Sequence, residues 1–169
     1  MINGVNSREM ILEILLEIEE GEHSHVAIRN ALSKYQFLPK QDRAFITRVC
    51  EGTLEYRIQI DYIINSFSKV TVDKMKPAIR EILRSAVYQL KYMDSVPDSA
   101  VCNEAVKLAQ RKGFYNLKPF VNGVLRTIAR EMDQVQFPKK EDDLVKYLSV
   151  KYSLDHASQL EYCKDFLQS

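Results

Sequence analysis

The sequence predicts an all-α protein, and two kinds of observation support this. Apolar residues recur at the 3.6-residue period of a helix in almost every segment, most clearly between residues 77 and 93. Residues that start or stop helices, such as Pro77, Pro97 and Gly113, fall at the borders of these segments. No segment shows a convincing strand pattern. We therefore expect a helical bundle around one core, which 169 residues are enough to form.

Polar caps and a glycine mark the helices of the amino-terminal half. One helix is expected from Asn6 or Ser7 to Gly21, one is capped by Ser24, and one begins near Lys40 or Gln41. We expect Gly52 to bend the third helix, because glycine costs ~1 kcal/mol inside a helix. Residues 58–67 continue or restart it, and residues 68–73 form a polar connector.

The next helix is expected from Pro77 to Met93, and Pro77 suits its first turn. The two helical halves of the bundle should meet at this helix. The stretch from Pro97 to Arg130 then predicts two helices that bury one side and present a basic side. Asp98 and Ser99 are good N-cap residues. We expect the apolar residues in the core: Val101, Cys102, Ala105, Leu108 and Ala109, then Leu117, Phe120, Val121, Val124, Leu125 and Ile128.

The basic side of this pair is our candidate for a nucleic-acid interface. Six bases lie between residues 107 and 130 with no acid among them, and four more, Lys76, Arg80, Arg84 and Lys91, flank the preceding apolar stripe. Bases from three helices are expected to form one surface that neutralises phosphates, so binding should weaken with salt. Glycine on this side would let a backbone approach closely. The candidate residues are Arg80, Arg84, Lys107, Arg111, Lys112, Lys118, Asn122, Gly123, Arg126 and Arg130.

Each part of this candidate site has a simpler alternative. The bases could be a solvated helical face. Asn122 could read a base edge, or it could make a hydrogen bond that packs helices together. Aromatic residues could stack on unpaired bases, although burial is their commoner fate. The best stacking candidates are Phe114 and Tyr115, beside the bases, followed by Tyr56 and Tyr88.

Composition limits the class of protein. The hydrophobic content of 46% and the charged content of 28% are ordinary for a globular protein, and a net charge of +1 predicts no partner. No apolar run reaches the length of a membrane span, and the first ten residues lack signal-peptide features. The cysteines are Cys50, Cys102 and Cys163. Their spacing is not that of a disulfide framework or a zinc site, and it fits a reducing, cytoplasmic compartment. The histidines lack partners at metal spacing and are expected on the surface: His23, His25 and His156.

A set of motifs resembles the signature of the NusB-like RNA-binding domain over about residues 5–154. These motifs are Val-Pro-Asp at 96–98, Asn-Glu-Ala at 103–105, Ala109, and Phe-Val-Asn-Gly-Val-Leu-Arg at 120–126. Free transcription antitermination factors of the NusB type share this signature with the amino-terminal domain of RsmB/Sun/Fmu-type ribosomal RNA cytosine-C5 methyltransferases. The closing Arg126 and the motifs at 42–45 and 51–54 resemble the methyltransferase group more. Free NusB proteins tend to carry an arginine-rich amino-terminal segment, whereas Arg8 stands alone among glutamates here.

The resemblance implies an orthogonal helical bundle, with residues 1–138 as the RNA-binding domain and residues 139–169 as a helical tail or linker. That tail would lead to a covalently attached methyltransferase domain absent from this chain. Small-subunit (16S) ribosomal RNA is the implied partner, and S-adenosylmethionine is the implied cofactor of the full-length enzyme, not of this chain. The family's nucleophilic cysteine follows a proline in that separate domain, whereas no cysteine follows a proline here. We assign no catalytic or metal-binding residue.

Two alternatives stay open at this point. The chain could be a free NusB-type antitermination factor that binds RNA. It could also belong to another class, as a helical adaptor whose basic face meets an acidic protein.

Overall fold

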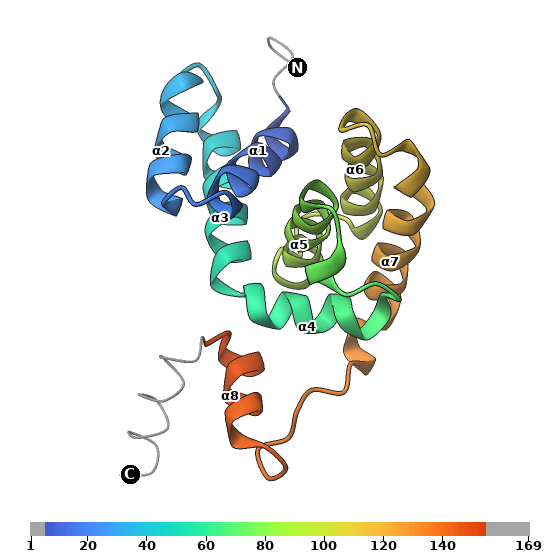
Figure 1. Cartoon of the computed structure of the whole chain (residues 1–169). Coiled ribbons are helices and arrows are strands. Elements are labelled where there is room, and N and C mark those ends of the chain that lie inside the picture. The colour runs from blue at the N-terminus through green and yellow to red at the C-terminus, as the bar shows by residue number, and fades with distance from the viewer. Residues whose placement is uncertain (1–5, 155–169) are drawn as a thin grey trace, which may run out of the picture.

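The structure, a computed structural model, describes residues 6–154 and is all-α over that range (Figure 1). The helices are α1 (Ser7–Glu19), α2 (Ser24–Lys34), α3 (Lys40–Glu55), α4 (Arg57–Phe67), α5 (Pro77–Tyr92), α6 (Asp98–Arg111), α7 (Lys118–Glu131) and α8 (Leu144–Tyr152). Short 3-10 turns are η2 (Val72–Lys74), η3 (Tyr115–Leu117) and η4 (Met132–Gln134). No described residue lies in a strand, so the predicted fold class is confirmed. Part of the predicted tail, residues 155–169 with His156 and Cys163, lies outside the described residues.

The helix ends follow from local chemistry. Asn6 accepts hydrogen bonds at its Oδ1 from two backbone N–H groups in the first turn of α1. Gly21 and Gly113 follow α1 and α6 with φ angles of 116° and 85°, which strain any residue with a side chain. The predicted caps at Ser24 and Asp98 are wrong by one position. α2 and α6 begin at these residues, and neither helix has a side-chain hydrogen bond at its cap.

Helix α5 lies at the centre of the bundle, between α1–α3 on one side and α6–α7 on the other (Figure 1). It contacts α1, α3, α4, α6 and α7, and α4 lies crosswise below α5 in the view, between the two halves. The apolar stripe of α5 is buried, with Ile82, Leu83 and Val87 at most 1% exposed. The predicted meeting of two helical halves at this helix is therefore confirmed.

Gly52, where we expected a bend, has a packing role in the structure. α3 continues through it to Glu55. A Cβ atom built on Gly52 would lie 2.1 Å from Cζ of Tyr88 on α5, so the tyrosine ring occupies the space of a side chain. The ring is 6% exposed and packs at 5.4 Å from the ring of Tyr92. Glycine at this position therefore lets α3 approach the central helix closely.

We expect Gly52→Ala to destabilise the fold by ~1–3 kcal/mol, because the tyrosine ring must move out of a packed site. This cost should exceed the gain of ~1 kcal/mol in helix propensity. Gly123→Ala on α7 is a matched control, since its Cβ would meet no atom within 4 Å. The control should stabilise by ~0.5–1 kcal/mol. Urea unfolding followed by circular dichroism measures both, and equal midpoints for the two variants would contradict the described packing.

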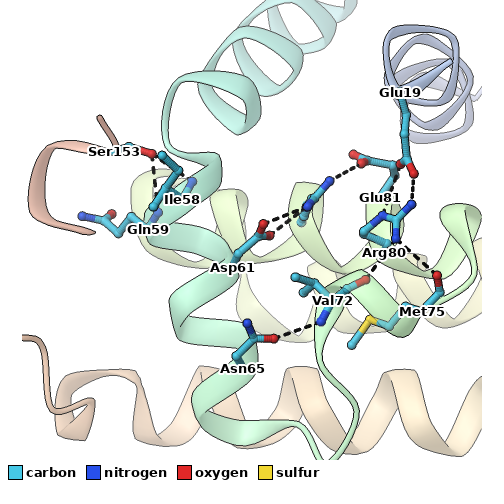
Figure 2. A network of polar contacts seen from close by, with 11 residues as sticks. Glu19, Ile58, Gln59, Asp61, Asn65, Val72, Met75, Arg80, Glu81 and Ser153 are labelled. Carbon is cyan, nitrogen blue, oxygen red and sulfur yellow. Dashed lines mark hydrogen bonds and ion pairs between the residues drawn. The ribbon is translucent and has the colours of Figure 1, made fainter. Parts of the chain in front are cut away.

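Two arginines of α5 are held in ion pairs between helices (Figure 2). Arg84 donates from Nε and Nη2 to the two carboxylate oxygens of Asp61 on α4, at 2.7 and 2.8 Å. It also donates from Nη1 to Glu81, at 2.7 Å. Arg80 pairs with Glu19 of α1 and donates to two carbonyl oxygens in the connector before α5. These contacts tie the central helix to α1 and α4.

The ion pairs of Arg84 are mostly withdrawn from solvent. The side chains of Arg84 and Glu81 are 12% and 5% exposed. Burial raises the pKa of Glu81 above its ordinary value, although Arg84 lowers it in part. For Arg84, burial lowers the pKa, but its two carboxylate partners together raise it more, so that its net pKa lies above the ordinary value. The pair of carboxylates therefore depends on this arginine for its charge balance.

Helix α8 docks against α4 and supplies its cap (Figure 2). Ser153, in a left-handed conformation with φ 53°, accepts hydrogen bonds at Oγ from the backbone N–H groups of Ile58 and Gln59, at 2.9 and 3.4 Å. α4 has no side-chain cap from its own N-cap residue, so a distant serine satisfies its first turn. Leu148 and Val150 are buried against the body. Within the predicted tail, α8 is thus packed against α4.

Candidate nucleic-acid interface

The hairpin of α6 and α7 turns its polar residues outward. The apolar positions expected in the core are all buried or half-buried, and Val121, Leu125 and Ile128 have no exposed surface. The helical phase of both helices is therefore as predicted, which places the bases between residues 107 and 130 away from the core. Asn122 and Gly123 are exposed on the same side.

Among the bases of this face that form an ion pair, Lys107 and Arg130 have the most exposed side chains. Their side chains are 60% and 67% exposed, and their partners Glu104 and Glu131 lie at 3.2 and 3.5 Å. Exposed pairs of this kind contribute ~0–1 kcal/mol to stability. A phosphate group could therefore replace either carboxylate at little energetic cost.

Arg126 joins the two helices through a pair of asparagines. Its Nη2 donates to Oδ1 of Asn103 on α6 at 2.7 Å, and its Nε donates to Oδ1 of Asn122 at 3.2 Å. Asn103 is exposed and was absent from our predicted site. It belongs to the Asn-Glu-Ala motif that we quoted for the resemblance, so the signal was present in the sequence without a role attached to it.

Arg111 and Lys112 lie at the carboxyl end of α6, close to α1. Lys112 pairs with Glu13, and Arg111 lies 3.8 Å from Glu9. These glutamates belong to the acidic stretch near the amino terminus, which the structure brings beside the basic hairpin. This end of the predicted surface is therefore partly neutralised from within the chain.

The expectation that Arg80 and Arg84 share one surface with the α6–α7 bases is wrong. Their side chains are only 15% and 12% exposed, because they reach toward carboxylates on α1 and α4. A guanidinium that is already held by a carboxylate and mostly buried has little to offer a phosphate. The exposed basic face therefore comes from two helices, α6 and α7.

Among the aromatic candidates, Tyr115 alone of the four predicted is strongly exposed, at 64%. Nζ of Lys118 lies 4.6 Å from its ring centroid and also donates to Gln110 at 2.8 Å. Phe114 is half-buried and packs against the core, so its expected stacking role is not supported. Tyr88 is buried, and Tyr56 is half-buried and stacks on Tyr92 at 4.5 Å. The turn between α6 and α7 therefore offers one accessible ring.

A sequence model of the NusB family matches residues 5–130, which is well over half of the chain and includes the whole hairpin apart from the last residue of α7. The chain belongs to the NusB family.

This NusB-family chain is similar to two kinds of protein. It is 35% identical over 124 residues to the probable ribosomal RNA small subunit methyltransferase B of Bacillus subtilis (strain 168), covering 73% of this chain and 28% of that protein. It is 33% identical over 134 residues to the transcription antitermination protein NusB of Dictyoglomus thermophilum, covering 79% and 88%. The chain thus spans less than a third of the methyltransferases that it matches first, and most of the NusB protein.

The NusB fold is also supported by a solved structure. A chain in the crystal structure of antitermination factors NusB and NusE in complex with dsRNA matches with a TM-score of 0.67 at 21% identity. The match covers 73% of this chain and 93% of that chain. Together with the all-α architecture, this confirms the predicted NusB-like bundle.

The two thiols that the structure of this NusB-family chain describes lack the exposure and lowered pKa of a nucleophile. Cys50 and Cys102 are fully buried, and burial raises the pKa of both thiols above the ordinary value. The predicted place of Cys102 in the core is confirmed. His23 and His25 are exposed and stack on each other, and residues 6–154 contain no group of three or more His, Cys, Asp or Glu able to hold a metal. No helix in that range is long and apolar enough to cross a membrane.

Proposed function

We propose that this chain is an RNA-binding domain, and that it holds small-subunit (16S) ribosomal RNA for a cytosine-C5 methyltransferase domain attached after residue 169. The observation that carries the proposal is the exposed face of α6 and α7, where Lys107, Arg126 and Arg130 lie with two asparagines and a bare glycine backbone. When such a face binds phosphates, the counterions of the RNA are released, and this gain in entropy favours binding. Gly123 lowers the stability of its helix, although no described residue packs close enough to require a glycine there. A glycine at this position fits the close approach of a partner.

Attachment to a methyltransferase is supported by what lies beyond the family match. That match ends at residue 130, yet the chain continues through Phe137, which stacks on Tyr62, into α8 and the cap at Ser153. The aligned region makes up only 28% and 29% of the two methyltransferases that the chain matches first. An extension that packs against the bundle in this way suits a linker that holds two domains in a fixed relative position.

The methyl donor would belong to the attached domain. S-adenosylmethionine supplies an electrophilic methyl group, and its binding needs a shaped nucleotide site. The described residues contain no strand followed by a glycine-rich loop, and their cysteines are buried with raised pKa. These residues do not fit the cofactor, and we assign them RNA positioning alone.

Reversing charge on α7 tests the RNA face. Arg126→Glu combined with Arg130→Glu should weaken binding to 16S RNA fragments and reduce the slope of affinity against salt, because each lost phosphate contact lowers that slope by ~0.9. Arg29→Glu combined with Lys34→Glu carries the same charge change on α2, away from the hairpin, and should have a smaller effect. Fluorescence anisotropy at several salt concentrations measures both. Equal affinities for the folded α7 variant and the wild type would remove α7 from the site.

A free NusB-type antitermination factor is the second candidate, favoured by the alignment that covers 88% of the Dictyoglomus thermophilum protein. The reading frame downstream of Ser169 separates the two candidates. A continuation with a cofactor-binding domain and a Pro-Cys motif supports the methyltransferase, and a stop codon there supports the free factor. An adaptor for an acidic protein would gain support if no RNA fragment bound at low salt.

A further inference from the structure

We propose that Asn103, Asn122 and Arg126 form a phosphate-binding site in which every outward hydrogen-bonding group is a donor. The proposal rests on the RNA-binding function above and names its contact chemistry. It also adds Asn103, which neither the motif nor the charge pattern had marked as a ligand-binding residue.

The orientation of both amides follows from the arginine between them. A guanidinium has five N–H donors and no acceptor, so the atom of each asparagine that faces it must be the carbonyl oxygen. Both Oδ1 atoms are in fact within hydrogen-bond distance of Arg126, at 2.7 and 3.2 Å. Each Nδ2 group therefore turns away from Arg126, and the structure shows no hydrogen bond from either Nδ2 to another described residue.

The spacing along the two helices extends this donor group into a row. Residues four apart lie on one helical face, so Lys107 follows Asn103 on α6, and Arg130 follows Arg126 on α7. Arg126 is held from both sides, which means that binding costs it little additional side-chain entropy. The exposed Gly123 beside Asn122 leaves open space, with no atom within 4 Å of where a Cβ would be.

Such a row suits a phosphate better than a base edge. Recognition of adenine by asparagine uses the carbonyl and the amide of one side chain together, and here each carbonyl is occupied by Arg126. Phosphate oxygens accept hydrogen bonds and donate none, so they match a group of donors with positive charge. The contact should therefore position RNA without reading its sequence. Of the two roles considered for Asn122, the reading of a base edge is therefore not favoured, and the hydrogen bond to Arg126 supports the packing role.

Asparagine-to-aspartate exchanges test the proposal. Asn122→Asp, and separately Asn103→Asp, keeps the side-chain size and an oxygen for Arg126 but replaces the outward donors by a charged acceptor. Since the variant loses a hydrogen bond to a charged group and turns a negative charge toward the phosphate, we expect RNA affinity to fall ~10-fold or more. Asn116→Asp in η3 adds the same charge at an exposed position in the turn of the same hairpin. It should reduce affinity much less, and thermal unfolding should confirm that all three variants fold.

The outcomes separate this proposal from the function on which it rests. Equal losses for Asn116→Asp and Asn122→Asp would mean that only general charge matters, which overturns the donor site and leaves RNA binding intact. Failure of the wild-type chain to bind any RNA fragment would overturn the proposed function itself.

Nuclear magnetic resonance of the asparagine side-chain amides identifies the source of the phosphate. Shifts of the Asn103 and Asn122 amide signals with an RNA oligonucleotide support the site. Shifts with inorganic phosphate but not with RNA would assign it to free phosphate and overturn the RNA contact. Shifts with neither probe would overturn the site altogether.

Discussion

Arg84→Met should lower the free energy of unfolding by ~3–5 kcal/mol, the cost expected when one partner of a buried ion pair is removed. Arg84 forms two hydrogen bonds with Asp61 and one with Glu81, and its side chain is 12% exposed. Without it, two carboxylates remain close together at the junction of α4 and α5 with no cation between them. Methionine fills a similar volume, so the loss reports charge rather than a cavity.

Arg130→Met provides the control, because that side chain is 67% exposed on α7. Urea unfolding should place the control within ~0.5 kcal/mol of the wild type, as for most surface positions. An Arg84→Met variant as stable as this control would show that the network contributes nothing to folding.

The Arg84→Met deficit should also depend on pH in a definite direction. Burial raises the pKa of Glu81 in the folded protein, and loss of Arg84 removes an interaction that lowers it. A carboxyl group with a raised folded pKa binds its proton more tightly when folded, so its contribution to stability falls as pH rises between the unfolded and folded pKa values. The deficit should therefore shrink as the pH is lowered through that interval. Unfolding midpoints compared at acidic and neutral pH test the sign.

Leu125→Ala should cost ~2–5 kcal/mol, because it removes buried methyl groups and leaves a cavity. Leu125 has no exposed surface and lies on the inner side of α7. Val145→Ala on α8 is the control, since that side chain is 48% exposed, and its cost should stay within ~0.5 kcal/mol. Thermal unfolding of both variants measures the difference. A Leu125→Ala cost as small as that of the control would mean that α7 is turned the other way.

Leu125 and Arg84 also illustrate what could be predicted from the sequence. The burial of Leu125 follows from periodicity, which depends only on neighbours within a few turns of the same helix. The fate of Arg84 depends on Asp61, which is 23 residues away along the chain and on another helix. A charged residue beside an apolar stripe has the same local pattern whether it meets solvent or a carboxylate. The pattern therefore could not separate a phosphate-binding arginine from a structural one.

The candidate site shows the same limit. An absence of acids between residues 107 and 130 predicted an uncompensated basic face, but Glu13 of α1 reaches Lys112 from the far end of the chain. Asn103 became a site residue only because Arg126 contacts it across the hairpin. The sequence around Gly52 predicted a bend in its helix, whereas the structure shows that the ring of Tyr88 fills the space of a side chain at this position. In each case the missing information was a contact between helices.

The cap that Ser153 places on α4 has a consequence for synthesis of the protein. Ser153 follows Ile58 by 95 residues, and a chain leaves the ribosome from its amino terminus. The first turn of α4 therefore emerges long before its cap and must be satisfied by water until then. The cap on α4 therefore comes from nearly the last residue that the structure describes. Any domain encoded downstream would thus leave the ribosome after the residues that complete the bundle.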